Sequence, residues 1–471
     1  MSATRLVAFN TLVQLIARAV TTVASFLVVG YLARYLGVEG YGQYTLIFAY
    51  LALFSVIVDF GFFLLQVREV TKYPDRASDI LGNILSIKLL LSVVAFGGAY
   101  LAARVFYHDP VMIQGIAIGS VYQAALSLTL VPMSLFQAQL KMHKTAIVDI
   151  IARLSYLGLV IWGIHHNVGL LGIILMISAI NLAGFLVQLA WAWPATPITP
   201  KWDFKYWQEF LIEAWPMGLV GMLSVLYFRI DTVMLGAIKG EYAVGIYGPP
   251  YRVLEVVLTI PTMFMSSVFP VFTRALAESR ERALKIFSKS VGFLGIVGLP
   301  IAFGVMAVGT PFMIMMAGAD FAASGIVLKI LIWAAAISFF GAVTNYSLIA
   351  AGRQKDLVWP YLVAAVFNII ANLIAIPHYS YIGAAIVTVV TEAIAAGYVA
   401  VMAYREFKFK LPWAMLLKAL ISAAVMVGAI KSIGLTNLWL NIAIGGAIYL
   451  LLVACFKMVD KSIVKELIRL K

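Results

Sequence analysis

Long apolar runs separated by short polar connections dominate the sequence. Segments of about 20 residues suit helices that cross a hydrocarbon core about 30 Å thick, whereas barrel strands would be about 10 residues long and would alternate. We therefore predict an all-α integral membrane protein. Its fourteen expected transmembrane helices lie near residues 7–32, 43–66, 80–103, 111–140, 145–164, 168–192, 208–236, 242–272, 286–316, 322–350, 357–376, 381–404, 412–430 and 438–456.

Composition agrees with this interpretation. Hydrophobic residues make up 63% of the 471 residues and charged residues only 12%, with a mean hydropathy of +0.99. A soluble domain carries about 25% charged residues, so this chain cannot cover itself with a polar surface. The single cysteine, Cys455, excludes an internal disulfide framework and a thiolate metal cage.

The net charge of +13 reflects topology rather than nucleic-acid binding. If the amino terminus is cytoplasmic, 23 Lys and Arg residues fall in cytoplasmic segments and 4 in external connections. This asymmetry follows the positive-inside rule. We expect a multi-pass protein of the plasma (cytoplasmic or inner) membrane, with both termini in the cytoplasm and no nucleic-acid partner.

An internal repeat relates the two halves of the chain. The connector RYLGVEGYGQY (34–44) resembles KGEYAVGIYG (239–248), and the offset of 203 residues aligns Gly37 with Gly240. A second pair, 144–173 and 355–384, aligns at an offset of 211. Because each offset covers an even number of spans, the copies run in the same direction through the membrane, as in transporters built from parallel repeats. Glycine permits the sharp turn that each external connector needs.

The repeat divides the chain into two parallel six-helix lobes related by pseudo-two-fold symmetry, with a further helix pair outside them. A Pro- and Trp-rich cytoplasmic linker joins the lobes, and the end of the chain has the spacing of an amphipathic helix on the inner leaflet. Pro249 and Pro250 are the hinge candidates, although a static kink is an equal alternative. The predicted parts are 1–192 (first lobe), 193–207 (linker), 208–404 (second lobe), 405–456 (extra helices) and 457–471 (tail).

Ionisable residues inside the spans are the candidate functional groups, because each charge at mid-depth costs about 2.5–3.5 kcal/mol. Asn10, Gln14 and Arg18 follow one another at helical spacing and give the first helix a polar face. Basic residues from both lobes facing one cavity would suit a phosphate-bearing substrate. The cationic candidates for substrate binding are Arg18, Lys88, Arg153, Arg252 and Lys329.

Isolated deep acids are candidates for coupling to H⁺ or Na⁺. These are Asp59, Glu255 and Glu392. Structural alternatives stay open. Arg252 can form an ion pair with Glu255, three residues further along the helix, and Asp149 can form one with Arg153. The Lys88 side chain can also snorkel toward the inner membrane surface.

The sequence carries no signal of an enzyme or of a metal centre. It has no phosphate-binding loop and no nucleophile elbow, and its five histidines lie in or near loops. A membrane glycan polymerase or transferase would usually need large external loops, whereas the external connections here are short. We expect no metal and no cofactor, with coupling to an ion or to the membrane potential left open.

Three segments resemble a known family. YLARYLGVEGYGQYTLIFAYLALFSVIVDFGF (31–62), REVTKYPD (68–75) and NYSLIAAGRQK (345–355) are similar to sequences of the polysaccharide transport family, the Wzx-type flippases of the multidrug/oligosaccharidyl-lipid/polysaccharide superfamily. The resemblance implies a flippase that moves polyprenyl-pyrophosphate-linked oligosaccharides, such as O-antigen precursors, to the outer leaflet. It implies alternating access of the lobes around a cationic cavity, with membrane lipids and polysaccharide-assembly proteins as further partners. The alternative is a multidrug exporter of the same superfamily, which would have an acidic and aromatic cavity.

Overall fold

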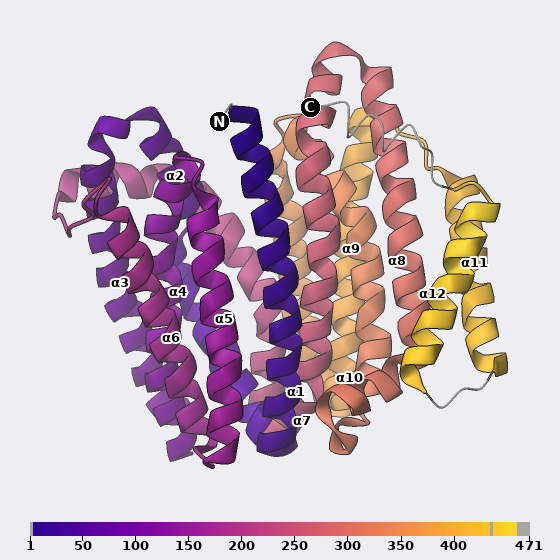
Figure 1. Cartoon of the computed structure of the whole chain (residues 1–471), viewed down its shortest axis with the longest axis horizontal. Coiled ribbons are helices and arrows are strands. Elements are labelled where there is room, and N and C mark those ends of the chain that lie inside the picture. The colour runs from indigo at the N-terminus through magenta and orange to yellow at the C-terminus, as the bar shows by residue number, and fades with distance from the viewer. Residues whose placement is uncertain (1–2, 434–436, 459–471) are drawn as a thin grey trace. The chain divides into compact units, whose positions relative to one another are not determined.

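The computed structural model describes residues 3–433 and 437–458, and within these residues the regular structure is entirely helical (Figure 1). Eleven of the described helices are long and apolar enough to cross a membrane. The predicted all-α membrane fold is thereby confirmed. The number of fourteen spans stays a prediction, because three of the long helices contain a bend and each covers two predicted spans.

Contacts divide the chain into two compact units, Met1–Gly236 and Ala237–Lys471. The helices of the first unit are α1 (Ala3–Asp59), α2 (Phe62–Lys72), the 3₁₀ turn η1 (Pro74–Arg76), α3 (Ala77–Phe106), α4 (Pro110–Ala138), α5 (Met142–His165), α6 (Gly169–Ala192) and the start of α7 (Phe204–Glu278). The second unit holds the rest of α7, α8 (Arg280–Ala317), η2 (Ala319–Phe321), α9 (Ser324–Ala350), η3 (Gln354–Leu357), α10 (Val358–Phe407), α11 (Trp413–Ile433) and α12 (Leu438–Cys455).

Glycines bend α1 and α7 at matching positions of the repeat. Gly37 has φ 67° and ψ −176°, and Gly240 has φ 78° and ψ −176°. A side chain at either position would meet no atom within 4 Å, so glycine is needed there for its backbone conformation and not for space. The prediction that these glycines turn the chain sharply is confirmed.

The third bend has a different cause. Ser380 in α10 has φ 51°, and Gly383 follows it closely in the chain. A Cβ atom at Gly383 would lie 2.6 Å from the carbonyl oxygen of Ala375, so the backbone passes itself too closely for any side chain. This close approach explains why residue 383 is glycine.

The division at residue 237 differs from the predicted boundary at the linker. The start of α7 packs within the first unit: a Cβ at Gly236 would lie 2.6 Å from Leu46, and one at Gly218 would lie 2.9 Å from Phe60. Pro249 and Pro250 are buried in a continuous helical part of α7. Their role as a hinge stays a prediction.

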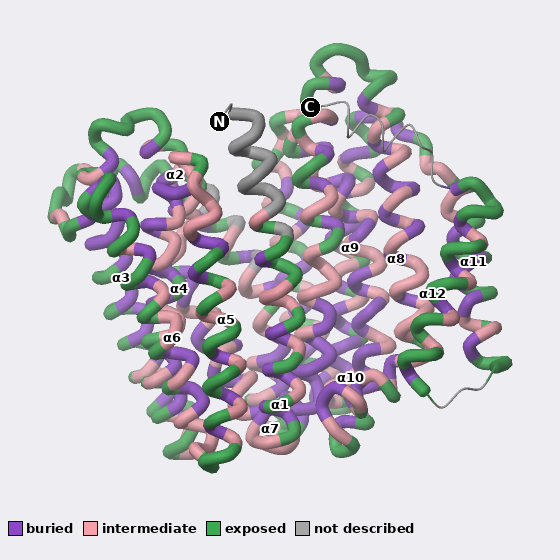
Figure 2. Tube along the Cα trace, viewed as in Figure 1, coloured by how far each residue is buried: buried purple, intermediate pink, exposed green. Residues whose placement is uncertain are grey.

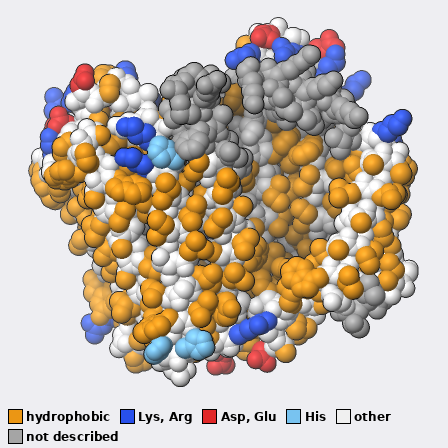
Figure 3. All heavy atoms as spheres, viewed as in Figure 1, with side chains coloured by type: hydrophobic (Ala, Val, Ile, Leu, Met, Phe, Trp, Pro, Cys, Tyr) orange, Lys and Arg blue, Asp and Glu red, His pale blue; other side chains and the backbone are white. Residues whose placement is uncertain are grey.

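Buried residues line the inside of each unit (Figure 2), and apolar side chains cover much of the face that Figure 3 shows. On α3, for example, Ile84 and Ala99 are buried, whereas Val93 and Leu101 are 73% and 64% exposed. Large exposed apolar surfaces of this kind mark contact with lipid or with another protein. Figure 3 shows most charged side chains gathered at helix ends, as expected for a membrane-spanning chain.

The last two helices pack against α8. The Tyr449 hydroxyl of α12 donates a hydrogen bond of 2.7 Å to the carbonyl of Ile296. Gly292 and Gly295 of α8 leave room for Met415 and Leu416 of α11. The predicted amphipathic tail lies outside the described residues, apart from its first two positions.

Candidate functional site: a buried lysine–aspartate pair

Lys88 and Asp59 form an ion pair inside the first unit. The Lys88 Nζ atom lies 2.8 Å from Asp59 Oδ1 and donates a second hydrogen bond of 2.9 Å to the carbonyl of Ser127 on α4. The same ammonium group lies 5.9 Å from the centre of the Phe62 ring. The Lys88 side chain is completely buried, whereas 38% of the Asp59 side chain is exposed. The structure therefore brings together one predicted substrate-binding cation and one predicted coupling acid.

A break between α1 and α2 positions the carboxylate. α1 ends at Asp59, and both Phe60 (φ 32°) and Gly61 (φ 70°) leave the right-handed helical region before α2 begins at Phe62. An acid at the end of a helix meets the negative pole of the helix dipole, which is unfavourable. The ammonium group of Lys88 offsets this repulsion.

The surroundings of Lys88 are mostly apolar. Core residues of this unit lie beside it in sequence on α3, among them Ile84, Leu85 and Ile87. A charge in such an environment is stable only when it is paired and hydrogen-bonded. The alternative that Lys88 snorkels to the membrane surface is wrong for this conformation, because its Nζ atom ends on α1 and α4 inside the protein.

Further buried polar atoms lie on the helices that hold this pair. Ser92, one turn beyond Lys88 on α3, and Ser127 have buried hydroxyls without a hydrogen-bond partner among the described residues. Gln66 on α2 is completely buried, and neither side-chain amide atom is bonded within the described part of the chain. Such atoms usually bind water or a ligand. Sequence reasoning missed Gln66, because glutamine carries no charge to mark it in an apolar run.

The other two predicted cations of the first unit lie elsewhere. Arg18 is exposed on α1, where the nearby hydroxyls of Thr21 and Ser25 bond to carbonyls of their own helix. Arg153 is half-buried on α5. The structure does not bring either residue into contact with the Lys88–Asp59 pair, and their role in substrate binding stays a prediction.

In the second unit, Arg252 and Glu255 bond to each other at 2.6 Å. The simpler alternative, in which Arg252 and Glu255 neutralise each other one turn apart on the helix, therefore accounts for part of this pair's contacts. Lys329 is half-buried on α9, and its aliphatic stem passes over Gly309 of α8, where a Cβ would lie 3.2 Å from Lys329 Cγ. The roles of Arg252 and Lys329 in substrate binding, and of Glu255 in ion coupling, also stay predictions.

Glu392 belongs to a polar group between α9 and α10. It accepts a short hydrogen bond from the Ser338 hydroxyl. In the same pair of helices the Tyr361 hydroxyl donates to Asn345 at 3.1 Å, and Asn368 donates to Thr391 across the bend of α10 at 3.4 Å. A half-buried acid in hydrogen-bonding surroundings suits ion binding, and this keeps the coupling hypothesis for Glu392.

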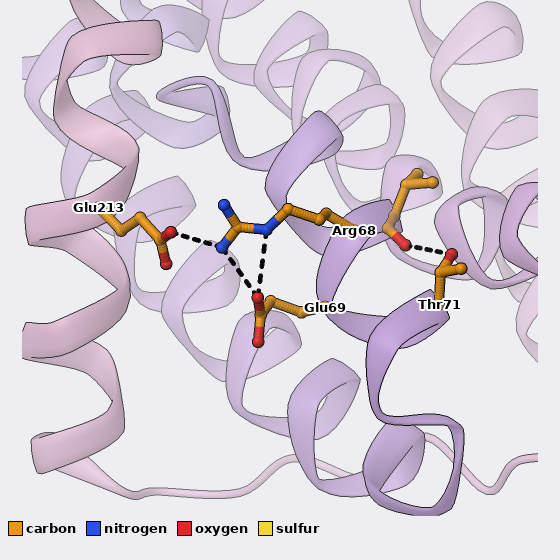
Figure 4. Close-up of polar contacts among 5 residues, drawn as sticks. Arg68, Glu69, Thr71 and Glu213 are labelled. Atoms are coloured by element: carbon orange, nitrogen blue, oxygen red, sulfur yellow. Dashed lines mark hydrogen bonds and ion pairs between the residues drawn. The ribbon is translucent and has the colours of Figure 1, made fainter.

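A surface cluster joins α2 to the start of α7 (Figure 4). The Arg68 guanidinium donates to Glu69 at 2.9 Å and, through a shorter contact, to Glu213. Arg68 and Glu213 are about half exposed, so the cluster adds little stability. The pairing was not predicted, because 145 residues separate the partners. Among the described residues, no group of three side chains is arranged to hold a metal ion.

Comparison with known proteins identifies related families. Residues 7–276 match the model of a family described as "Polysaccharide biosynthesis protein", and residues 216–374 match one described as MatE. A Haloferax volcanii protein named as a probable low-salt glycan biosynthesis flippase, Agl15, is 22% identical over 466 residues, which cover 94% of this chain and 95% of the relative. The capsular polysaccharide biosynthesis protein CapF of Staphylococcus aureus is 22% identical over 399 residues, or 81% of this chain and 95% of CapF.

Solved structures share the fold. The lipid II flippase MurJ in an inward closed conformation has a TM-score of 0.79 at 15% identity, and the match covers 95% of this chain and 98% of MurJ. An inward-facing multidrug resistance transporter of the MATE family has a TM-score of 0.67 at 14% identity, covering 84% of this chain and 98% of that one. At such identities the likeness shows the fold alone.

Proposed function

Because this chain belongs to the polysaccharide biosynthesis protein family, we propose that it is a flippase for lipid-linked oligosaccharides. The observation that carries the proposal is the family match over residues 7–276. Two relatives that match most of the chain support it, because their names refer to glycan flipping and to capsular polysaccharide biosynthesis. The likeness to the MurJ fold over 95% of the chain also supports it.

The Lys88–Asp59 pair supplies a chemical basis for recognising such a substrate. Polyprenyl-pyrophosphate carriers are anions, and an ammonium group binds phosphate oxygens through strong charge-assisted hydrogen bonds. Lys88 is fully buried and needs a negative partner, while Asp59 is partly exposed at a helix break. We propose that pyrophosphate replaces the Asp59 carboxylate at Lys88 during transport, so that the lysine is paired in both the empty and the loaded protein.

Further parts of the proposal concern the membrane and the energy source. The asymmetry of basic residues supports cytoplasmic termini in the cytoplasmic membrane and transport from the inner to the outer leaflet. Ion coupling would use Asp59, Glu255 or Glu392, and alternating access of the two lobes follows from the family resemblance. Polysaccharide-assembly proteins would receive the product on the outer side.

Reconstituted transport tests the proposed function. Purified protein is placed in liposomes with a short polyprenyl-pyrophosphate oligosaccharide, and the arrival of the glycan in the opposite leaflet is followed with a membrane-impermeant reagent. We expect transfer that requires the protein and is lost in the double variant Lys88→Met/Asp59→Ala, which removes both charges of the pair and should fold. Arg18→Ala tests the predicted substrate-binding cation on α1. Protein-dependent transfer that the double variant retains would refute the role of the pair.

The MatE match over residues 216–374 favours a second candidate, export of organic cations. The same liposomes, loaded with a fluorescent organic cation, discriminate the two. Efflux of the cation together with absent glycolipid transfer would replace the flippase by an exporter.

A further inference from the structure

The first unit contains a polar pocket that the proposed transport chemistry does not use. It lies where the segment between α6 and α7 meets the beginning of α3, and its volume is about 280 Å³. Two basic residues, two acids, an amide and two aromatic rings line it. Arg76 and Lys201, two of its lining residues, belong to segments that the distribution of basic residues predicts to be cytoplasmic.

Specific contacts build this pocket. The linker runs against α3, where its Lys201 N–H donates to the carbonyl of Gly82 at 3.2 Å and its Asp203 N–H donates to Asn83 Oδ1 at 2.9 Å. A Cβ at Gly82 would lie only 2.3 Å from the carbonyl oxygen of Thr199, so the approach depends on glycine. Asn83 also accepts a hydrogen bond of 3.1 Å from the indole of Trp207. The linker is therefore a docked element with a fixed course.

The charges of the pocket are balanced. Lys201 forms an ion pair with Asp79. The Asp203 carboxylate accepts hydrogen bonds of 3.1 Å from the backbone N–H groups of Lys205 and Tyr206 in the first turn of α7. Arg76 supplies the second positive charge. Two carboxylates at the rim disfavour a bare phosphate. A neutral ligand with many hydroxyl groups suits this pocket, since carboxylate and guanidinium groups both form strong hydrogen bonds with hydroxyls.

Two aromatic residues complete the lining. Trp202 is 59% exposed and presents an apolar ring to a ligand. The Tyr206 hydroxyl is buried and has no hydrogen-bond partner in the described part of the chain. Burial raises the pKa of the Tyr206 hydroxyl above its ordinary value, so it remains protonated and can donate. An aromatic face beside fixed donors and acceptors is complementary to a sugar ring, which has an apolar C–H face and hydroxyls along its edge.

We propose that this pocket binds a sugar unit of the lipid-linked oligosaccharide on the cytoplasmic side, before translocation. The inference rests on the proposed function, because it assigns the pocket to the glycan part of the same substrate. The pyrophosphate would engage Lys88 and the glycan would engage the pocket at a separate step. The residues that determine glycan specificity would then include Trp202, Tyr206 and Arg76.

Two independent measurements test the pocket with the full-length protein. Lipid-linked oligosaccharides are extracted from membranes of the source organism, and mild acid releases the free oligosaccharides from part of the extract. Binding of the free oligosaccharides is measured by saturation-transfer NMR and by tryptophan fluorescence, and transfer of the intact glycolipids is measured in liposomes. The variants are Trp202→Ala and Tyr206→Phe. The matched controls are Trp193→Ala, an exposed linker tryptophan outside the pocket lining, and Tyr73→Phe.

We expect each pocket variant to weaken sugar binding about three- to tenfold, as the loss of one hydrogen bond or one ring contact predicts. The KM for glycolipid transfer should rise by a similar factor with unchanged kcat, and the controls should match the wild type. Protein-dependent transfer with variants indistinguishable from the wild type would overturn the pocket and leave the flippase function intact. Sugar binding that the variants lose, with no transfer by the wild type, would support the pocket and overturn the function. If Trp202→Ala and Trp193→Ala weaken sugar binding and glycolipid transfer equally, Trp202 would be assigned to membrane anchoring and its role in the pocket would be overturned.

Discussion

Replacing Asp59 with alanine removes the carboxylate that neutralises Lys88. The ammonium group would remain fully buried, with the Ser127 carbonyl and the face of Phe62 as its remaining contacts, and neither carries a negative charge. Breaking a buried ion pair by deleting one partner costs about 3–5 kcal/mol. We expect Asp59→Ala to lower the free energy of unfolding by about 3 kcal/mol, at the lower end of this range because Asp59 itself is partly solvated.

Replacing Lys88 should lower the free energy of unfolding by less than replacing Asp59 does. The difference arises because Lys88 is fully buried, whereas Asp59 is partly exposed. Lys88→Met removes the buried charge and fills a similar volume, while the remaining Asp59 carboxylate keeps 38% of its surface exposed. We expect a loss of about 1–2 kcal/mol. The double variant leaves neither charge and should lie within about 1 kcal/mol of the wild type, because apolar replacement of a buried pair is often neutral.

Reversible unfolding of the purified protein in mixed micelles, followed by tryptophan fluorescence, gives the three free energies and the coupling between the two sites. Asp75→Ala, which removes an exposed acid from the same region, is the control and should change stability by less than about 0.5 kcal/mol. Equal losses in the two single variants would refute the assigned asymmetry. A double variant whose loss equals the sum of the single losses would show that the residues do not interact.

Three further variants test other parts of the structure. Gly240→Ala should cost about 1–2 kcal/mol through its left-handed backbone alone, whereas Gly98→Ala, in an open helical position, should be neutral or stabilising; thermal unfolding compares them. Tyr449→Phe should cost about 1–3 kcal/mol, because it leaves a buried carbonyl of α8 without its hydroxyl donor, and protease accessibility of α12 should increase. Glu392→Gln keeps an acceptor for Ser338 and should preserve folding; if Glu392 couples transport to an ion, glycolipid transfer should lose its response to an imposed H⁺ or Na⁺ gradient.

Most helices could be predicted because their signal is contained in the local sequence. The predicted span 168–192 corresponds to α6 at Gly169–Ala192, and the predicted span 145–164 corresponds to α5 at Met142–His165. Twenty consecutive apolar residues in a membrane have few alternatives to a helix, since every backbone polar group must be bonded within the segment. The repeated glycines at 37 and 240 could be assigned a turn for the same local reason.

The candidate site could be predicted only residue by residue. Lys88 and Asp59 were each recognised as expensive charges, but they are 29 positions apart, with α2 and η1 between them. Hydropathy contains no information about which helix faces meet. The break at Phe60 and Gly61 was also missed, because both residues continue an apolar run. Gly61 was the available signal: a glycine two residues after a deep acid indicates a place where the helix can end.

Under the proposed function, the Lys88–Asp59 pair also explains why the protein would rarely change conformation without bound substrate. Separating Asp59 from Lys88 without a replacement anion would cost about 3 kcal/mol, which corresponds to a population about a hundredfold smaller. A pyrophosphate group removes this cost because it supplies the missing negative charge at the same ammonium group. The helix break beside Asp59 would give the carboxylate a place at which to move, while the completely buried Lys88 would stay in place. Substrate charge would then select the conformation in which the pair is open, so binding and movement would be coupled through a single buried lysine.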